Sequence, residues 1–511
     1  MKKSILFSAL FSAAFAFCGC SDTSCNSEKL VILHTNDTHS QIEPDSKGLG
    51  GVMRRKAVLD SVRAAEKNVL LVDAGDAVQG TLFFYLYGGK VEQELMNLLD
   101  VNIRILGNHE FDNGIDSLAK VLSLSDAEKI STNYNLDNTP LKGLFQPYSI
   151  KEYCGKRIGF LGINLNPDGI ITPGNYDGLK FEPIVATANA AAKKLKTDEG
   201  VDAVIALTHI GYNPKGLDGD SILATNSHDI DIIIGGHSHD TIDPSTEIGA
   251  RRCRLTNLDG EEVLVVQTGK AGRYLGKIEI DLDSLTLGGS PKYELIRIDN
   301  RYDSYNNADL AQTIDKYSQG VDSLMHLWVG STSKELKNSE PELLNYFTDF
   351  IFDAGSLLAP NIDLAIANKG GLRCNIPAGQ FSKGHIINMI PFSNYVTVLD
   401  IKGSDLLDVF EVMAKDGGNG ISRGVRATYS PVGLGKATIN GKAINPSKTY
   451  RVATIDYLAK GGDYMTGLTH GTIIAQSALP VYEEMLKYLT EGKGSKSEMG
   501  GDPIARWTSV K

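Results

Sequence analysis

Seven side chains that can bind metal ions follow short apolar runs in the first half of the chain. They lie in five motifs: Asp37 and His39 in Thr-Asn-Asp-Thr-His, Asp76 in Asp-Ala-Gly-Asp, Asn108 in Leu-Gly-Asn-His-Glu-Phe-Asp, His209 in Leu-Thr-His, and His237 and His239 in Gly-Gly-His-Ser-His-Asp. Nitrogen and oxygen donors of this kind suit zinc, manganese, iron and similar ions. A carboxylate shared by two cations would reduce their repulsion, and Asp76 is the candidate. The motifs therefore predict a site in which two metal ions activate a water molecule.

Each motif directly follows a stretch with the composition of a buried β-strand. The five stretches cover residues 30–33, 69–72, 103–106, 203–207 and 232–234. Open α/β sheets bind ligands at the carboxyl ends of their strands, and rigid elements position ligands better than loops do. One histidine at a strand end is usually structural, and His34 and His228 have only that interpretation. The prediction of a metal site therefore rests on the joint pattern.

Length and composition limit the class of protein. A chain of 511 residues is expected to form two or three domains, and 42% hydrophobic with 22% charged residues is typical of a globular protein. The formal net charge of -11 argues against binding to a nucleic-acid polymer, which requires a basic surface. An anionic substrate would need a local cationic site, and two divalent metal ions would supply one.

The N-terminus has the pattern of an export signal. Lys2 and Lys3 precede an apolar run that is too short for an ordinary membrane span, and the sequence Phe-Cys-Gly-Cys-Ser follows. This resembles a bacterial lipoprotein signal with an acylated Cys20. It predicts a signal peptide over residues 1–20, a polar tether over 21–28 and an extracytoplasmic, membrane-anchored protein. The alternative is a cleaved secretory peptide with incidental cysteines.

The remaining chain divides into two α/β regions. Residues 29–290 alternate apolar runs with helical segments, and residues 291–327 are predicted to be a linker containing a polar helix over 307–327, although an ordinary surface helix has the same pattern. A second α/β domain is predicted over 328–511. Cys25, Cys154, Cys253 and Cys374 follow the signal, and their spacing does not distinguish disulfides from buried thiols.

Individual elements follow from the apolar periodicity. Helices are predicted over 52–66, 185–196, 342–352 and 404–414, and further strands over 157–163, 262–267, 363–367 and 395–401.

The five motifs together resemble those of the calcineurin-like metallophosphoesterases, specifically the two-domain bacterial UDP-sugar hydrolase/5′-nucleotidase family. The segment 106–114, Leu-Gly-Asn-His-Glu-Phe-Asp-Asn-Gly, is the most specific match, and the resemblance covers nearly all of the chain after the signal. It implies a four-layer α/β sandwich joined by a linker helix and a hinge to an α/β substrate-binding domain. The resemblance also implies the ligands of two zinc or manganese ions. One ion would be bound by Asp37, His39, Asp76 and His239, and the other by Asp76, Asn108, His209 and His237.

The same resemblance implies catalytic roles for two further residues. His109 would face the substrate, and Asp112 would orient its imidazole. Such an imidazole could stabilise charge on the phosphoryl group and protonate the leaving oxygen. A hydroxide bridging the metal ions would attack phosphorus in line.

The second domain contains segments similar to the family's nucleotide-binding segments. By that resemblance, Phe392 and Tyr457 would stack on the base, Asp463 would contact the nucleoside, and Asn368 and Arg373 would hold polar groups of the substrate. Taken singly, either aromatic ring could be core packing and Arg373 could form a surface ion pair. Two positions depart from the family pattern: Leu344 stands where glycine is usual, and Lys337 where arginine is common.

The predicted function is hydrolysis of nucleoside 5′-monophosphates, with UDP-sugars and nucleoside di- and triphosphates as further substrates. One alternative is a 2′,3′-cyclic-nucleotide 2′-phosphodiesterase/3′-nucleotidase. Another is a non-catalytic nucleotide-binding lipoprotein, which predicts loss of the metal ligands or of His109. The sequence retains both.

Overall fold

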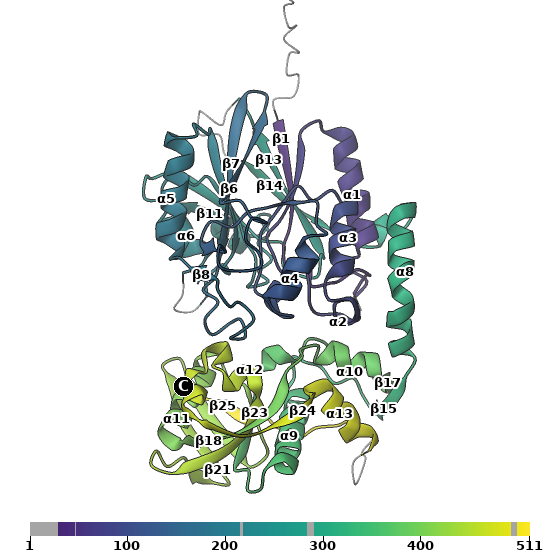
Figure 1. The fold of residues 1–511 in the computed structure, drawn as a ribbon, viewed down its shortest axis with the longest axis vertical. Coiled ribbons are helices and arrows are strands. Elements are labelled where there is room, and N and C mark those ends of the chain that lie inside the picture. The colour runs from purple at the N-terminus through teal and green to yellow at the C-terminus, as the bar shows by residue number, and fades with distance from the viewer. Residues whose placement is uncertain (1–28, 46, 215–217, 284–290, 492–497, 511) are drawn as a thin grey trace, which may run out of the picture.

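A computed structural model describes residues 29–45, 47–214, 218–283, 291–491 and 498–510, and the predicted signal peptide and tether lie outside these ranges. Two α/β domains are stacked along the long axis of the molecule, and helix α8 (Ala308–Met325) runs along one side between them (Figure 1). The predicted two-domain α/β fold is confirmed. None of the helices in the described ranges combines the length and apolar character needed to cross a membrane.

Two mixed sheets face each other in the N-terminal domain. Within the described residues their strand orders are β14-β13-β1-β2-β3-β4 and β11-β12-β10-β9-β7-β6. The first contains β1 (Lys29–Thr35), β2 (Val69–Asp73), β3 (Ile103–Arg104), β4 (Glu128–Lys129), β13 (Tyr274–Asp281) and β14 (Lys292–Arg297). The second contains β6 (Tyr148–Tyr153), β7 (Lys156–Asn164), β9 (Ala203–His209), β10 (Ile232–Ile234), β11 (Arg254–Thr256) and β12 (Glu262–Val266). The central pairs β1–β2 and β9–β10 are parallel, so their carboxyl ends lie at one edge.

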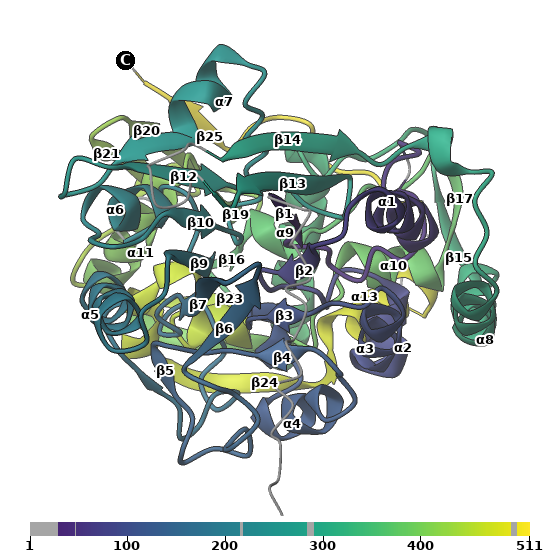
Figure 2. The same ribbon diagram turned by 90° about the horizontal axis from the view of Figure 1, so that it is seen from above.

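Alternation along β1 divides its side chains between two cores. Leu30 and Ile32 share a buried cluster with the second sheet, whereas Val31 and Leu33 pack with helices α1 and α3. The helices that cover the sheets are α1 (Val52–Ala65), α3 (Lys90–Leu98), α5 (Ile184–Thr197) and α6 (Asp220–Thr225). The order of layers is therefore helix, sheet, sheet, helix (Figure 2).

The helices predicted over 52–66 and 185–196 are confirmed as α1 and α5. Strand β3 ends at Arg104, two residues earlier than predicted, because Ile105 and Leu106 already lead into the Gly-Asn-His loop. Strand β14 pairs with β13, so the first domain extends beyond residue 290 and the predicted linker boundary there is wrong. Cys154 forms a disulfide, whereas Cys253 and Cys374 are free thiols.

Helix α8 packs chiefly on the first domain. Its Leu310 and Tyr317 are buried, and the Tyr87 hydroxyl donates a hydrogen bond of 2.8 Å to the Tyr317 carbonyl oxygen. Its last turn also reaches the second domain, because Met325 lies against Gly384. The helix predicted over 307–327 is thus confirmed, and it contacts both domains.

The C-terminal domain contains a five-stranded sheet, in the order β19-β16-β23-β18-β24 within the described residues. Its strands are β16 (Leu364–Ala367), β18 (Tyr395–Lys402), β19 (Gly420–Ile421), β23 (Thr449–Ile455) and β24 (Thr472–Pro480). Its helices include α9 (Pro341–Leu358), α10 (Lys383–Met389), α11 (Gly403–Lys415), α12 (Asp456–Ala459) and α13 (Val481–Thr490). A second sheet contains β20 (Val425–Ser430), β21 (Gly433–Ile439), β22 (Lys442–Ala443) and β25 (Trp507–Ser509). Phe347, Phe350 and Ile351 of α9 lie in the main core.

His34 is a buried histidine on β1 that is not a predicted ligand. Within the described residues neither ring nitrogen has a hydrogen-bond partner, and the ring stacks on Tyr293 at 5.8 Å between centroids. Gly276 makes room for it, because a Cβ there would lie 1.9 Å from His34 Nε2. Burial lowers the pKa of His34 to about 3.

His34 should therefore destabilise the fold in acid. Its pKa in the unfolded chain is about 6.5, so protonation favours unfolding as the pH falls from about 6.5 toward 3. Between pH 7 and pH 5, we expect the free energy of unfolding of His34→Leu to gain about 2 kcal/mol relative to the parent protein. Denaturant titrations at both pH values measure this difference, and a pH-independent difference would contradict it.

Candidate active site

Five of the predicted metal ligands have left-handed backbone conformations. The φ angles are +50° at Asp37, +48° at His39, +53° at Asp76, +76° at His237 and +57° at His239. Such conformations cost about 1–3 kcal/mol each in non-glycine residues and cluster at functional sites. Backbone hydrogen bonds hold the turns: the Asp37 and His39 N–H groups donate to the carbonyl oxygens of Gly75 and Asp76 at 2.9 and 3.0 Å.

The structure brings the predicted ligands together in two clusters. Donor atoms of Asp37, His39 and His239 lie within 4.8 Å of one another, and so do those of Asp76, His209 and His237. Asn108 joins the second cluster, because its Oδ1 is 2.8 Å from His237 Nδ1. In the first cluster, the Nε2 atoms of His39 and His239 are 2.9 Å apart.

The orientation of the imidazoles fits metal binding. His209 Nδ1 lies 2.8 Å from the Ala74 carbonyl oxygen and His39 Nδ1 lies 3.3 Å from that of Val78, so each Nδ1–H can donate and leave Nε2 as the ligand atom. His209 Nε2 is buried and faces Asp76, whose Oδ2 lies 3.1 Å away. Burial also lowers the pKa of His237 to about 4, which favours its neutral, ligating form. The converging lone pairs and carboxylates fit two divalent metal ions, and the donors suit zinc or manganese.

His109 and Asp112 form a pair beside the clusters. His109 begins the short 3-10 helix η1 (His109–Phe111), and its Nδ1 lies 2.9 Å from Asp112 Oδ2. Its backbone N–H donates to Asp76 Oδ1 at 2.8 Å. Burial lowers the pKa of His109, but the carboxylates of Asp112 and Asp76 outweigh it, so the pKa is raised. An imidazolium at this position can stabilise negative charge or donate a proton.

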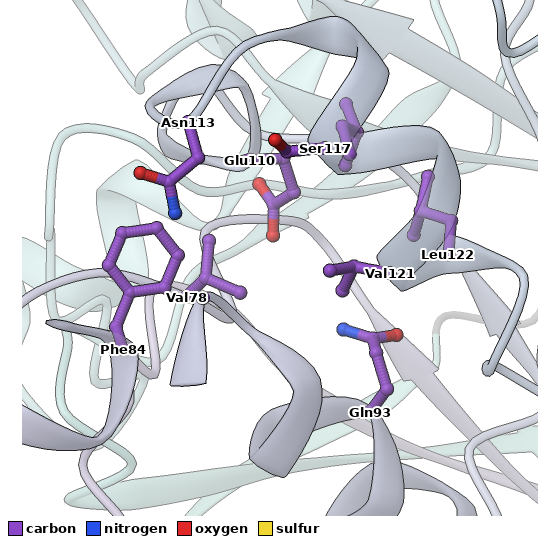
Figure 3. A pocket seen from close by; sticks show the side chains of 10 residues that line it. Val78, Phe84, Gln93, Glu110, Asn113, Ser117, Val121 and Leu122 are labelled. Atoms are coloured by element: carbon purple, nitrogen blue, oxygen red, sulfur yellow. The ribbon is translucent and has the colours of Figure 1, made fainter. Parts of the chain in front are cut away.

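Glu110, which no sequence pattern singled out, joins two loops that carry predicted ligands. Its Oε2 accepts hydrogen bonds from the N–H groups of Asp76 and Gly107 at 3.0 and 2.7 Å. Its Oε1 accepts from the Ala77 N–H at 3.0 Å and from Arg104 Nη2 at 3.3 Å. Figure 3 shows its carboxyl group beside a cavity of about 10 Å³ whose lining includes Val78, Gln93, Glu110 and Asn113.

Substitution of Glu110 should loosen the metal site. In Glu110→Gln an amide NH₂ replaces one acceptor oxygen and faces N–H donors, so we expect metal affinity to fall about 10- to 100-fold. Competition with a chromogenic chelator measures the affinity. Glu152→Gln, at an exposed position on β6, is the matched control. Unchanged metal affinity in Glu110→Gln would show that the metal site does not depend on the hydrogen bonds that the Glu110 carboxylate accepts.

A cavity of about 290 Å³ lies between the metal-ligand clusters and the second domain. Its lining from the first domain is Asp76, Asn108, His109, Asp112, Ile170, Thr172, His237 and His239. Its lining from the second domain is Asn368, Gly370, Gly371, Arg373, Phe392, Asn394, Tyr457 and Asp463. All five predicted substrate-binding residues therefore line the same cavity as His109 and Asp112.

Each aromatic ring of this cavity lies beside polar side chains. The Phe392 ring lies 5.9 Å from that of His109, and the Arg373 guanidinium lies 5.7 Å from the Phe392 ring centre. The Tyr457 hydroxyl donates to Asp463 Oδ1 at 2.8 Å, and Asn368 Nδ2 donates to Asp463 Oδ2 at 2.8 Å. Asp463 is thus held by its neighbours on both oxygens.

Apart from Gly370 and Gly371, which lie between Asn368 and Arg373 in the same motif, three lining residues were not among the predicted site residues. Asn394 lies two positions after Phe392, so its motif could have indicated it, whereas Ile170 and Thr172 lie in a loop with no distinctive pattern. Lys337 and Leu344, the two departures from the family pattern, do not line this cavity. Lys337 pairs with Glu340 at 3.0 Å, and Leu344 packs against the core of the second domain.

Comparison with known proteins matches both domains. The family model for calcineurin-like phosphoesterases matches residues 30–241, and that for the 5′-nucleotidase C-terminal domain matches residues 323–470. The 5′-nucleotidase of Rattus norvegicus is 30% identical over 420 residues, which cover 75% of this chain and 71% of the relative.

Two further similarities span most of the chain. The trifunctional nucleotide phosphoesterase protein YfkN of Bacillus subtilis (strain 168) is 26% identical over 526 residues, which cover 92% of this chain but only 34% of that protein. The crystal structure of the 5′-nucleotidase precursor from Thermus thermophilus superposes with a TM-score of 0.81 at 28% identity, covering 94% of this chain and 99% of that chain.

The two family models match the two domains in their order along the chain, and a similarity that covers 75% of the chain, as that to the rat enzyme does, extends into both domains. The metal-ligand clusters lie inside the phosphoesterase match, at the edge where the second domain meets it. The chain therefore belongs to the 5′-nucleotidase family and is a metal-dependent phosphoric ester hydrolase.

Proposed function

We propose that this protein hydrolyses nucleoside 5′-monophosphates to a nucleoside and inorganic phosphate. The observation that carries the proposal is the single cavity lined by ligands from both clusters, by His109 and by the nucleotide-binding candidates of the second domain. A phosphate at the clusters and a base at Phe392 would place a mononucleotide across the two domains. The similarity to proteins named 5′-nucleotidase supports this substrate.

The phosphate would be bound at the first domain. When bound, two divalent ions would polarise the phosphate and activate water for in-line attack on phosphorus. One ion would be held by Asp37, His39, Asp76 and His239, and the other by Asp76, Asn108, His209 and His237. His109, oriented by Asp112 at 2.9 Å, would stabilise the developing charge and protonate the leaving oxygen. The Arg373 guanidinium would bind the outer phosphate oxygens.

The nucleoside would be bound at the second domain. Phe392 and Tyr457 would stack on the base, which contributes about 1–3 kcal/mol per base and tolerates different bases. Asn368 and Asp463 would contact the nucleoside, and the hydroxyl of Tyr457 would fix Asp463 for this purpose.

UDP-sugars and nucleoside di- and triphosphates are proposed as further substrates, because the same attack on phosphorus would cleave their phosphoanhydride bonds. We also propose that the protein is exported and anchored in a membrane through lipid on Cys20. This proposal rests on the lipoprotein-like signal in the sequence.

A four-substrate assay tests the proposal. The soluble chain that begins at Cys25 would be given 5′-AMP, 3′-AMP, 2′,3′-cyclic AMP or UDP-glucose, with zinc, manganese or a chelator. We expect chelator-sensitive phosphate release from 5′-AMP, with the products of the cyclic ester and UDP-glucose followed by chromatography. Preference for 3′-AMP and the cyclic ester would favour the 3′-nucleotidase alternative. Folded protein that hydrolyses none of them would overturn the proposal.

A further inference from the structure

Gln79 is a buried side chain of the first domain that contacts the second. It follows Asp76 by three residues, has a backbone φ of +71° and is only 1% exposed. Its Oε1 accepts a hydrogen bond from Arg373 Nη2 at 3.3 Å. Its Nε2 has no hydrogen-bond partner in the part of the chain that the structure describes. The proposed reaction has so far given Gln79 no role.

The loop that carries Gln79 is fixed relative to the metal ligands. The carbonyl oxygen of Val78 lies 3.3 Å from His39 Nδ1, and that of Ala77 accepts the Ser40 N–H at 3.0 Å. On the other side, the Thr81 hydroxyl donates to the Ser40 carbonyl oxygen at 3.0 Å. The position of the Gln79 amide is therefore set by the loop that contains the Asp37 and His39 ligands.

The Arg373 side chain packs over the Phe392 ring, but that contact does not fix the direction of its N–H groups. The Arg373 backbone N–H donates to the Met389 carbonyl oxygen, but in the described residues the bond to Gln79 is the one hydrogen bond that the side chain makes. Since a guanidinium has five N–H donors, one donated to Gln79 fixes its rotation and leaves others for an anion in the cavity. Gln79 does not line that cavity and would act only through Arg373.

We propose that Gln79 is a positioning residue, which holds the Arg373 guanidinium in the orientation that binds the substrate phosphate. This inference rests on the proposed function, because it takes Arg373 to be a phosphate-binding residue. The hydrogen bond crosses from one domain to the other, so it also ties the orientation of Arg373 to this arrangement of the domains.

Steady-state kinetics with 5′-AMP test whether the hydrogen bond from Arg373 to Gln79 helps to bind the substrate. Gln79→Met keeps the length of the side chain and removes the acceptor, so we expect kcat/KM to fall about tenfold, mainly through KM. Gln79→Glu keeps an acceptor and should stay within about threefold of the parent protein. Metal affinity should be unchanged in both. Gln41→Met is the matched control, since in the part of the chain that the structure describes its amide bonds only the carbonyl oxygen of the exposed Glu43.

A double-mutant cycle with Arg373→Met separates this inference from the proposed function. If Gln79 acts through Arg373, Gln79→Met should change kcat/KM by less than about twofold once Arg373 is replaced. An equal loss in both backgrounds would overturn the role of Gln79 and leave that of Arg373 standing. If Arg373→Met alone has no effect, the phosphate-binding role of Arg373 fails first. Should Gln79→Met not fold, Gln79→Ala removes the same acceptor for the cycle.

Discussion

Replacement of His109 by alanine should lower kcat for 5′-AMP by about 10²- to 10⁴-fold, while both metal sites stay filled. The structure supports this because His109 lines the cavity and its Nδ1 is held by Asp112 at 2.9 Å, so its other ring nitrogen is available to the substrate. It lies beside the metal clusters without belonging to either. Single-turnover rates together with metal content measure the effect.

The control for this variant is His228→Ala, because His228 pairs with Asp259 on the surface, away from the cavity. The fall in kcat caused by His109→Ala should be smaller with 4-nitrophenyl phosphate than with 5′-AMP, because the leaving oxygen of 4-nitrophenyl phosphate needs no proton. Parental activity of His109→Ala with 5′-AMP would rule out the assigned role.

Asp76→Asn should lower kcat/KM by about 10³-fold or more and weaken binding of both metal ions. Asp76 is buried, its Oδ2 lies 3.1 Å from His209 Nε2, and its Oδ1 accepts the His109 N–H. The amide keeps the shape but removes the negative charge that would lie between two cations. It also replaces one donor oxygen with an NH₂ group that cannot bind a metal.

Elemental analysis after gel filtration and the rate with 5′-AMP measure both effects. Asp116→Asn, at an exposed position on helix α4 (Ile115–Leu122), is the matched control. An Asp76→Asn protein that retains two ions and parental activity would show that the carboxylate does not bridge them.

The sequence could indicate that these candidate ligands would meet because each motif directly follows an apolar strand. Parallel strands such as β1 and β2 bring their carboxyl ends to one edge, so residues 37 and 76 meet although far apart in the chain. Spacing could not predict the left-handed conformations at Asp37 and Asp76, which depend on hydrogen bonds to neighbouring loops. The family resemblance, rather than spacing, implied how the ligands divide between two ions, and their donor atoms lie in two clusters in the structure.

Contacts between distant segments were not predictable. Glu110 stands next to His109, but its role depends on N–H groups more than 30 positions away. Gln79 and Arg373 are separated by 294 positions and lie on different domains. The boundary near residue 290 was wrong because β14 is a polar edge strand, with exposed Lys292 and Glu294, that carries little apolar signal.

The most direct test of the account is a metal titration of chelator-treated protein with 5′-AMP as substrate. Zinc or manganese would be returned in measured equivalents while phosphate release is followed. With one ion for each of the two ligand clusters, the account predicts negligible release without metal and a plateau at two equivalents per chain. Full activity in the metal-free protein, or a plateau at one equivalent, would contradict it.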